Sequence, residues 1–184
     1  MKRIMVDLET LGLQPSAVVL SIGLVQFNEK EILDNLHVKL AIDPQIEAGR
    51  SIDGSTLDWW MNQEPNARHG LFSGAAQQSR LLVEDGLQLV WKFMQNVDEL
   101  WGNGAAFDNV VLRHLFMQFK GLTPWSYKAD RCYRTVRSMN NHVPFPTFQG
   151  VEHNALDDAR HQTIHLQLML WGNRDDAERA TDDV

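Results

Sequence analysis

The sequence is poor in several features that mark particular classes of protein. It contains a single cysteine, Cys132, among 184 residues. One cysteine cannot build an intrachain disulfide framework, so we expect a reducing, cytoplasmic setting. No apolar run is long enough to span a bilayer, and no apolar signal-peptide segment precedes the first strand-like stretch. The composition therefore favours a protein with no membrane association.

Basic residues are also scarce. Seventeen lysines and arginines stand against 24 aspartates and glutamates, which gives a formal net charge of −7. A general nucleic-acid binder is usually basic, so this balance argues against broad contact with a phosphate backbone. The argument weakens where acids gather at a candidate metal site, because bound cations reverse the local field there. An enzyme that grips only the end of a strand also needs few phosphate contacts.

The length and the apolar content predict one globular domain with a full core. With 43% hydrophobic and 22% charged residues, we expect a single domain over residues 1–172. Residues 173–184 are rich in acids and are expected to form a solvated, disordered tail. No repeat or interdomain linker interrupts the domain.

Hydrophobic periodicity predicts a mixed α/β fold. Residues 2–8, 18–27 and 31–40 read as strands, and residues 28–30 form a plausible hairpin connection, so the three strands could make an antiparallel meander. Helices are expected over 55–61, from Pro65, and over 87–94, 108–119, 130–139 and 154–171, with short strands at 97–101 and 126–129. This order favours a mixed sheet, with the meander and further parallel strands, flanked by helices.

The most informative feature is a carboxylate pair inside the first apolar run. Asp7 and Glu9 are two residues apart, and alternate residues of a strand point to the same side. Two carboxylates in one small space repel each other, and burying them without a partner is costly. A divalent cation such as Mg²⁺ or Mn²⁺ is the usual remedy, since both prefer oxygen ligands. A purely structural role for this pair alone is about equally plausible.

Two further blocks could complete such a site. Asp108 follows the small-residue segment 102–106 and would lie in the first turn of a helix, where an acid also simply favours the positive helix end. His153 would precede the last helix, with Asp158 inside it. Asp157 and Asp158 point about 100° apart on a helix, so only one should face the site. Taken alone, a histidine at this position is more often an ordinary surface residue.

Taken together and in order, these blocks resemble the DEDD superfamily of 3′→5′ exonucleases, in the histidine-bearing (DEDDh) branch with an RNase H-like fold. The Asp-x-Glu motif matches Asp7 and Glu9, the second motif matches Asp108, and a histidine followed five residues later by an aspartate matches His153 and Asp158. Within the superfamily the chain looks similar to a compact phage and bacterial exoribonuclease-like group. The stretch 56–60 followed by Ala67-Arg68 supports that placement.

The resemblance implies a two-metal hydrolase acting on single-stranded RNA or DNA from the 3′ end. Asp7, Glu9 and Asp158 would hold the metal that activates water, Asp7 would bridge to a second metal, and Asp108 would help through water. His153 would act as general base. RNA is slightly favoured, with an exodeoxyribonuclease as the alternative and a non-catalytic nucleic-acid-binding module as a less favoured one. Related enzymes are often homodimers, so a homodimer is possible.

The resemblance also places the end of the substrate against the segment after the first motif. Leu11 could wedge against the last base, and backbone groups could hold the 3′ hydroxyl. The candidate substrate-binding residues are Thr10, Leu11, Gly12, Trp59, Asn103 and Phe107, with Trp60 and Phe148 as further aromatic candidates for base stacking. For any one aromatic residue, core packing is the more frequent role. Trp60 fits the apolar face of its helix, whereas Trp59 need not.

Overall fold

A computed structural model describes residues 1–172; the predicted acidic tail, residues 173–184, lies outside the described residues. Its five-stranded sheet has the order β3-β2-β1-β4-β5. The first three strands form the predicted antiparallel meander, and β4 and β5 run parallel to β1. The strands are β1 (Arg3–Thr10), β2 (Val19–Phe27), β3 (Ile32–Lys39), β4 (Glu99–Gly102) and β5 (Asp130–Cys132). The predicted mixed α/β class is confirmed.

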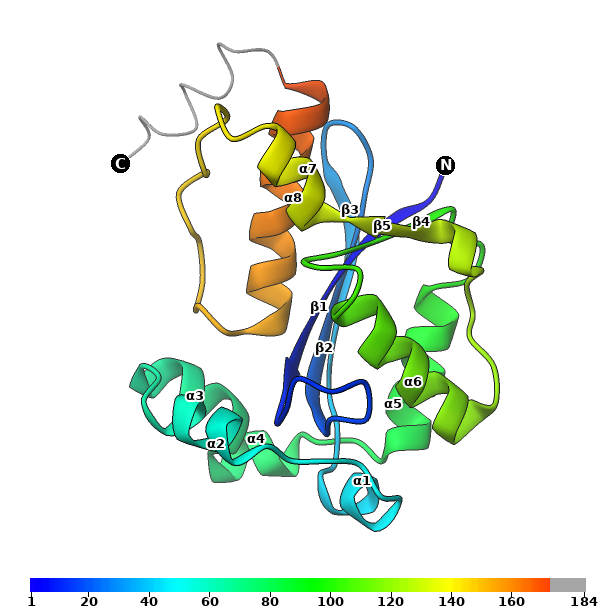
Figure 1. The fold of residues 1–184 in the computed structure, drawn as a ribbon, viewed down its shortest axis with the longest axis vertical. Coiled ribbons are helices and arrows are strands. Elements are labelled where there is room, and N and C mark those ends of the chain that lie inside the picture. Colours follow the sequence, from blue (N-terminus) through cyan, green and yellow to red (C-terminus); the bar gives the residue numbers. More distant parts are fainter. Residues whose placement is uncertain (173–184) are drawn as a thin grey trace.

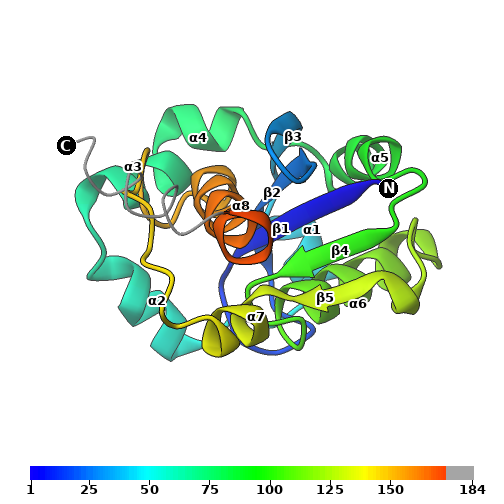
Figure 2. The same ribbon diagram turned by 90° about the horizontal axis from the view of Figure 1, so that it is seen from above.

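Helices cover both faces of the sheet. Long helix α8 lies on one face, against β1, β2 and β3, while α5 and α6 lie on the other (Figures 1 and 2). Helices α2, α3 and α4 form a separate group near the end of the sheet where β1 finishes (Figure 1). The helices are α1 (Asp43–Glu47), α2 (Gly54–Met61), α3 (Pro65–Phe72), α4 (Gly74–Gln78), α5 (Val83–Phe93), α6 (Asp108–Lys120), α7 (Tyr133–Met139) and α8 (Ala155–Trp171).

The alternation along β1 separates its apolar from its acidic side chains. One face of the strand carries Ile4, Val6 and Leu8, which are buried in the core beneath α5 and α6. Met5 points the other way, into the core beneath α8. Since side chains alternate along a strand, Asp7 and Glu9 share the α8 side with Met5. The strand thus aims both carboxylates at the start of α8.

Close packing at Gly23 brings α8 to these carboxylates. Gly23 of β2 pairs with Asp7 of β1. A Cβ atom at Gly23 would lie 2.2 Å from the carbonyl oxygen of Ala155, the first residue of α8. Only glycine leaves room for this approach, so the sequence sets the distance between the first turn of α8 and the end of β1.

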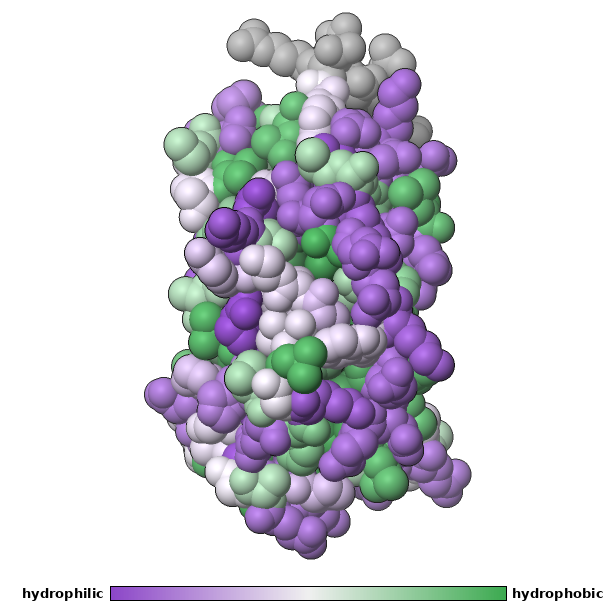
Figure 3. Space-filling model, turned by 90° about the vertical axis from the view of Figure 1, so that its right-hand side faces the viewer, coloured by the Kyte–Doolittle hydropathy of each residue, from purple (hydrophilic) through white to green (hydrophobic). Residues whose placement is uncertain are grey.

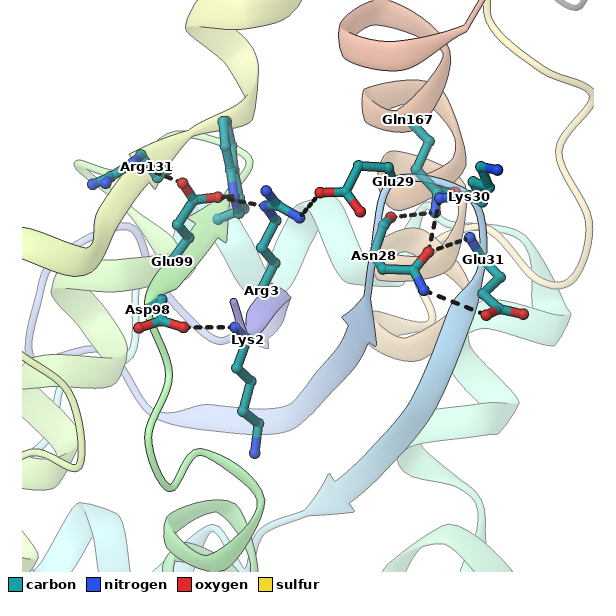
Figure 4. A network of polar contacts seen from close by, with 11 residues as sticks. Lys2, Arg3, Asn28, Glu29, Lys30, Glu31, Asp98, Glu99, Arg131 and Gln167 are labelled. Carbon is teal, nitrogen blue, oxygen red and sulfur yellow. Dashed lines mark hydrogen bonds and ion pairs between the residues drawn. The ribbon is translucent and has the colours of Figure 1, made fainter.

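A network of ion pairs fixes the strand register at the opposite end of the sheet (Figure 4). The guanidinium of Arg3 donates to Glu99 at 3.0 Å and to Glu29 at 2.7 Å, and the backbone N–H of Lys2 donates to Asp98 at 2.7 Å. These bonds tie β1 to the start of β4 and to the hairpin between β2 and β3. Because the parallel register of β1 and β4 is set here, the carboxyl ends of both strands meet at the other end.

The predicted strand over residues 126–129 was wrong. Tyr127–Ala129 form a 3₁₀ turn, and the strand follows as β5, so α7 begins at Tyr133 and not at Asp130. The hydroxyl of Ser126 accepts the backbone N–H of Lys128, which stabilises a turn in place of a strand. The cap of α2 is also two residues earlier than predicted, at Asp53.

The surface to which α5 and α6 contribute mixes hydrophilic residues with separate hydrophobic ones (Figure 3). The most exposed apolar side chains of α6 include Met117, at 53% exposure. Within residues 1–172, no helix combines the length and the apolar character that crossing a bilayer requires.

The homodimer expected from the sequence stays a prediction.

Candidate active site

The carboxyl end of β1 supplies the first two acids of the site. Glu9 is 7% exposed, and Asp7 is partly buried beside it. The pairing of β1 with β2 shifts between Glu9 and Thr10, where the strand ends. The hydroxyl of Thr10 then donates to the carbonyl of Gly12 at 2.7 Å, which helps to turn the chain away. Both carboxylates therefore stand at a strand end that opens towards α8.

The start of α8 supplies the second part. Asn154 caps the helix, since its side-chain oxygen accepts the backbone N–H groups of Leu156 and Asp157. Asp157 accepts the backbone N–H of Val151 at 3.0 Å, so it stabilises the preceding loop. Asp158 instead lies with Glu9, as the spacing argument required. His153, just before the cap, has a φ of +62°, a left-handed conformation that is uncommon for a residue with a side chain.

Asp108 reaches the same space from α6. It is the first residue of that helix and is 2% exposed. A Cβ atom at Gly102, the last residue of β4, would lie 3.0 Å from the Cβ of Asp108, so the strand end and the helix start are in close contact. The Oδ2 atom of Asp108 is buried and has no hydrogen-bond partner among the described residues.

The structure thus gathers all five predicted residues. One oxygen each of Glu9 and Asp158 and one ring nitrogen of His153 lie within 4.8 Å of one another. Asp7 adjoins the same cluster. Burial raises its pKa well above the ordinary value, and the charges of Asp108, Glu9 and Asp158 raise it further. The cluster stores electrostatic repulsion that a bound cation would relieve.

The pKa values of the other acids point the same way. Burial first, then the charges of Asp158 and Asp108, raise the pKa of Glu9. Burial raises the pKa of both Asp108 and Asp158 to about 7, although backbone N–H groups oppose the shift. Four carboxylates, one of which has a buried oxygen without a partner among the described residues, fit divalent cations such as Mg²⁺ or Mn²⁺. The predicted metal ligands are therefore able to hold a divalent metal.

Without a cation, the protein should lose stability as the pH rises from about 4 to 8. An unfolded aspartate titrates near ~3.9, whereas Asp108 and Asp158 keep their protons up to about 7 in the fold. Between these values the folded state binds more protons than the unfolded state, so the free energy of unfolding falls with pH. Urea unfolding in EDTA at pH 5 and pH 8 measures the loss, and Mn²⁺ should reverse it at pH 8. A midpoint independent of both pH and metal would contradict this.

Gln162 is a site residue that the sequence analysis missed. It lies one helical turn after Asp158, and its Nε2 donates to Oδ1 of Asp7 at 2.8 Å. Its Oε1 is buried without a partner among the described residues. The i, i+4 spacing from Asp158 was the available signal, because residues one turn apart share a helix face.

A cavity of about 470 Å³ opens beside Glu9. Three of the predicted substrate-binding residues line it, namely Thr10, Trp59 and Phe107, together with Trp60. Leu11 does not, because it is 3% exposed and packs in the core with Trp60 and neighbouring apolar residues. Gly12 does not line it either. Leu13, 69% exposed, takes the place expected of Leu11 at the cavity wall.

A second cavity, of about 410 Å³, contains the acidic cluster. It shares Glu9, Trp59 and Phe107 with the first, so the two adjoin. Asn103 lines this second cavity, and its backbone carbonyl accepts a hydrogen bond from Arg134 at 2.7 Å. Phe148 lines neither of these two cavities but a third, together with His153 and Asp158, and its ring lies 4.9 Å from that of His161 between centroids. The acidic cluster therefore stands beside a largely apolar cavity.

Comparisons with known proteins agree with this geometry. The sequence matches the family described as the 3′-5′ exoribonuclease Rv2179c-like domain over residues 2–170. The exodeoxyribonuclease of Enterobacteria phage T4 is 26% identical over an alignment of 202 residues, which covers 90% of this chain and 87% of that protein.

Solved structures share the fold. An E. coli exonuclease I complex with single-stranded DNA and zinc has a TM-score of 0.65 at 12% identity, over 91% of this chain and 40% of that one. The chain thus spans about two fifths of exonuclease I. The nuclease domain of 3′hExo, a DEDDh family member bound to rAMP, has a TM-score of 0.60 at 15% identity, over 92% and 91% of the two chains. The expected RNase H-like architecture is confirmed.

Proposed function

The chain belongs to the 3′-5′ exoribonuclease Rv2179c-like domain family and is a 3′→5′ exonuclease of the DEDDh type. On that premise we propose its reaction, its substrate and the role of each site residue. The proposed reaction is the hydrolysis of single-stranded nucleic acid, RNA before DNA, to nucleoside 5′-monophosphates. One observation carries it: Glu9, Asp158 and His153 place ligand atoms within 4.8 Å of one another beside a nucleoside-sized cavity.

We assign the metal ligands from the donor set. Asp7, Glu9 and Asp158 would hold one divalent cation, Asp7 would also face a second, and the free Oδ2 of Asp108 would act through water. When bound, two such cations lower the pKa of the attacking water and offset charge on the leaving 3′ oxygen. Gln162 keeps the Asp7 carboxylate turned towards this space by donating to its Oδ1.

His153 is the proposed general base. Its ring nitrogen lies within 4.8 Å of carboxylate oxygens of Glu9 and Asp158, so it borders the space where the scissile phosphate and the water would meet. An imidazole titrates near neutral pH and can accept the proton that the attacking water loses. The phosphate then remains with the released nucleotide, and the penultimate nucleotide keeps the 3′ oxygen.

The cavity beside Glu9 suits the terminal nucleoside. Its walls combine the aromatic rings of Trp59, Trp60 and Phe107 with the hydroxyl-bearing Thr10. Aromatic rings accept bases of any sequence by stacking, which fits an enzyme that removes successive nucleotides. Placing the terminal sugar here puts the preceding phosphate at the acidic cluster in the adjoining cavity.

RNA is proposed first because the matched family is described as exoribonuclease. A specific observation favours the alternative substrate, single-stranded DNA. The phage T4 relative is an exodeoxyribonuclease, and its alignment with this chain covers nearly the whole of both proteins. The two substrates differ in the 2′ hydroxyl, which needs its own polar contact to be recognised.

The test uses 5′-labelled single-stranded RNA and DNA of the same sequence with Mg²⁺ or Mn²⁺. Metal-dependent shortening from the 3′ end, faster on RNA, would support the proposal. Faster shortening of DNA would replace RNA with the alternative substrate. No cleavage of either strand would contradict the proposed substrate class.

Gln162→Leu should weaken metal binding about tenfold, because groups that orient metal ligands typically contribute 10- to 100-fold in affinity. Losing the amide frees the Asp7 carboxylate to adopt other orientations. Gln167→Leu is the matched control, since Gln167 is on the same helix and donates instead to the carbonyl of Asn28. Titration calorimetry with Mn²⁺ gives the affinity, and equal affinities for the two variants would refute the orienting role.

A further inference from the structure

A catalytic histidine is usually oriented by a hydrogen bond to its ring. On α8, the ring of His165 is held in this way, by the hydroxyl of Tyr133 and the carbonyl of Val143. Within residues 1–172, no hydrogen bond to a protein group holds the ring of His153. The backbone N–H of His153 is close enough to the carboxylate of Asp158 to lower the pKa of that group, and the φ of His153 is +62°. The ring therefore needs another support.

Two tryptophans of α2 provide it. The ring of Trp59 meets that of His153 edge to face, with 4.8 Å between centroids and 75° between planes. Trp60 stands behind both, 4.8 Å from Trp59 and 6.3 Å from His153. Trp60 itself is anchored, since it is 2% exposed and its indole N–H donates to the carbonyl of Thr10 at 2.9 Å. The end of β1 thus supports His153 through two edge-to-face contacts, from Trp60 to Trp59 and from Trp59 to His153.

Trp59 also faces the substrate. Its side chain is 43% exposed and lines both the nucleoside-sized cavity and the adjoining cavity that holds the acidic cluster. A base bound in the first cavity would cover the free surface of the Trp59 ring and restrict its rotation. The same Trp59 ring contacts the imidazole of His153. Rotation of Trp59 would break that contact, so a nucleotide base that prevents the rotation also keeps His153 in place.

We propose that Trp59 is the positioning residue for His153 and that it couples occupancy of the terminal-base cavity to the placement of the general base. This inference rests on the proposed function. A terminal nucleotide whose base fills the cavity holds Trp59, and Trp59 holds the imidazole at the phosphate. An aromatic edge-to-face pair stabilises one ring orientation by enough to change its population about tenfold.

A double-mutant cycle tests the coupling. The rate is measured under single-turnover conditions, with the protein in saturating excess over substrate, for the unaltered chain, Trp59→Ala, His153→Ala and the double variant. Trp59→Ala should lower that rate about tenfold when His153 is present and less than twofold when His153 is already alanine. Trp59→Phe should recover most of the loss, because it keeps an aromatic edge against the imidazole.

Two results would overturn this proposal and leave the proposed function intact. Equal losses from Trp59→Ala in both backgrounds would show that the residue acts independently of His153. A change confined to the protein concentration that gives half the maximal rate would show that Trp59 only binds the base. If His153→Ala itself had a normal rate, the general-base assignment in the proposed function would fail, and this inference with it.

A substrate with an abasic 3′-terminal residue tests the second half of the coupling. The missing base should lower the saturated rate of the unaltered chain about tenfold, and that of Trp59→Ala less than twofold, because no aromatic link is left to lose. Equal slowing of the two proteins would overturn the link between the cavity and the general base.

Discussion

Asp7→Asn should lower the exonuclease rate by about 1,000-fold or more, since the cations proposed for this site would supply several kcal/mol of transition-state stabilisation. Asp7 is the carboxylate proposed to face both cations. The substitution keeps the shape of the side chain and removes its charge. The rate of shortening of a 5′-labelled oligonucleotide at saturating Mn²⁺ measures the effect. A rate within tenfold of the unaltered chain would contradict the metal-bridging role.

Two controls separate this effect from misfolding. Asp58→Asn removes an exposed acid from α2 and should leave the rate unchanged. The Asp7→Asn protein should also be more stable than the unaltered chain without metal. Burial and the neighbouring carboxylates raise the pKa of Asp7, so its charge destabilises the empty site. Lower activity together with a higher melting temperature would exclude unfolding as the cause.

His153→Ala should lower the single-turnover rate by about 100-fold or more, which is the usual contribution of a general base. The measurement uses saturating Mn²⁺ and protein in saturating excess over substrate. The control is His142→Ala, which changes an exposed histidine in the preceding loop. A near-normal rate would remove His153 from the mechanism.

Metal affinity decides between two roles for this histidine. A ring nitrogen of His153 lies close enough to Glu9 and Asp158 to share a cation with them. Removing a general base leaves the Mn²⁺ affinity nearly unchanged, whereas removing a metal ligand lowers it. We expect the affinity of His153→Ala for Mn²⁺, measured by calorimetry, to stay within about threefold of the unaltered chain, well short of the 10- to 100-fold that even an orienting group contributes.

Local periodicity is why so much of the site could be predicted from the sequence. Alternation along a strand places Asp7 and Glu9 on one side whatever the rest of the chain does. The angle between successive helical residues separates Asp157 from Asp158, and the structure gives Asp157 a different task, holding the loop at Val151. Predictions that depend only on the period of a strand or helix hold in the folded protein, because tertiary contacts do not change that period.

The features that could not be predicted depend on the three-dimensional course of the loops. Leu11 and Leu13 are equally apolar, and only the turn at Thr10 and Gly12 decides that Leu11 enters the core while Leu13 reaches the cavity. The contact between Trp59 and His153 joins α2 to the start of α8 across almost a hundred residues. No local pattern reports such a contact, because it exists only after both elements have packed.

The most direct test of the central claim follows the oxygen of the attacking water. The protein digests a single-stranded oligonucleotide in ¹⁸O-labelled water with Mn²⁺, and mass spectrometry identifies the released nucleotides. The account predicts nucleoside 5′-monophosphates that carry one ¹⁸O atom on phosphorus, released in order from the 3′ end and absent with Asp7→Asn. Cyclic phosphates, 3′-monophosphates or unlabelled products would contradict it, because they require a nucleophile other than water or a different scissile bond.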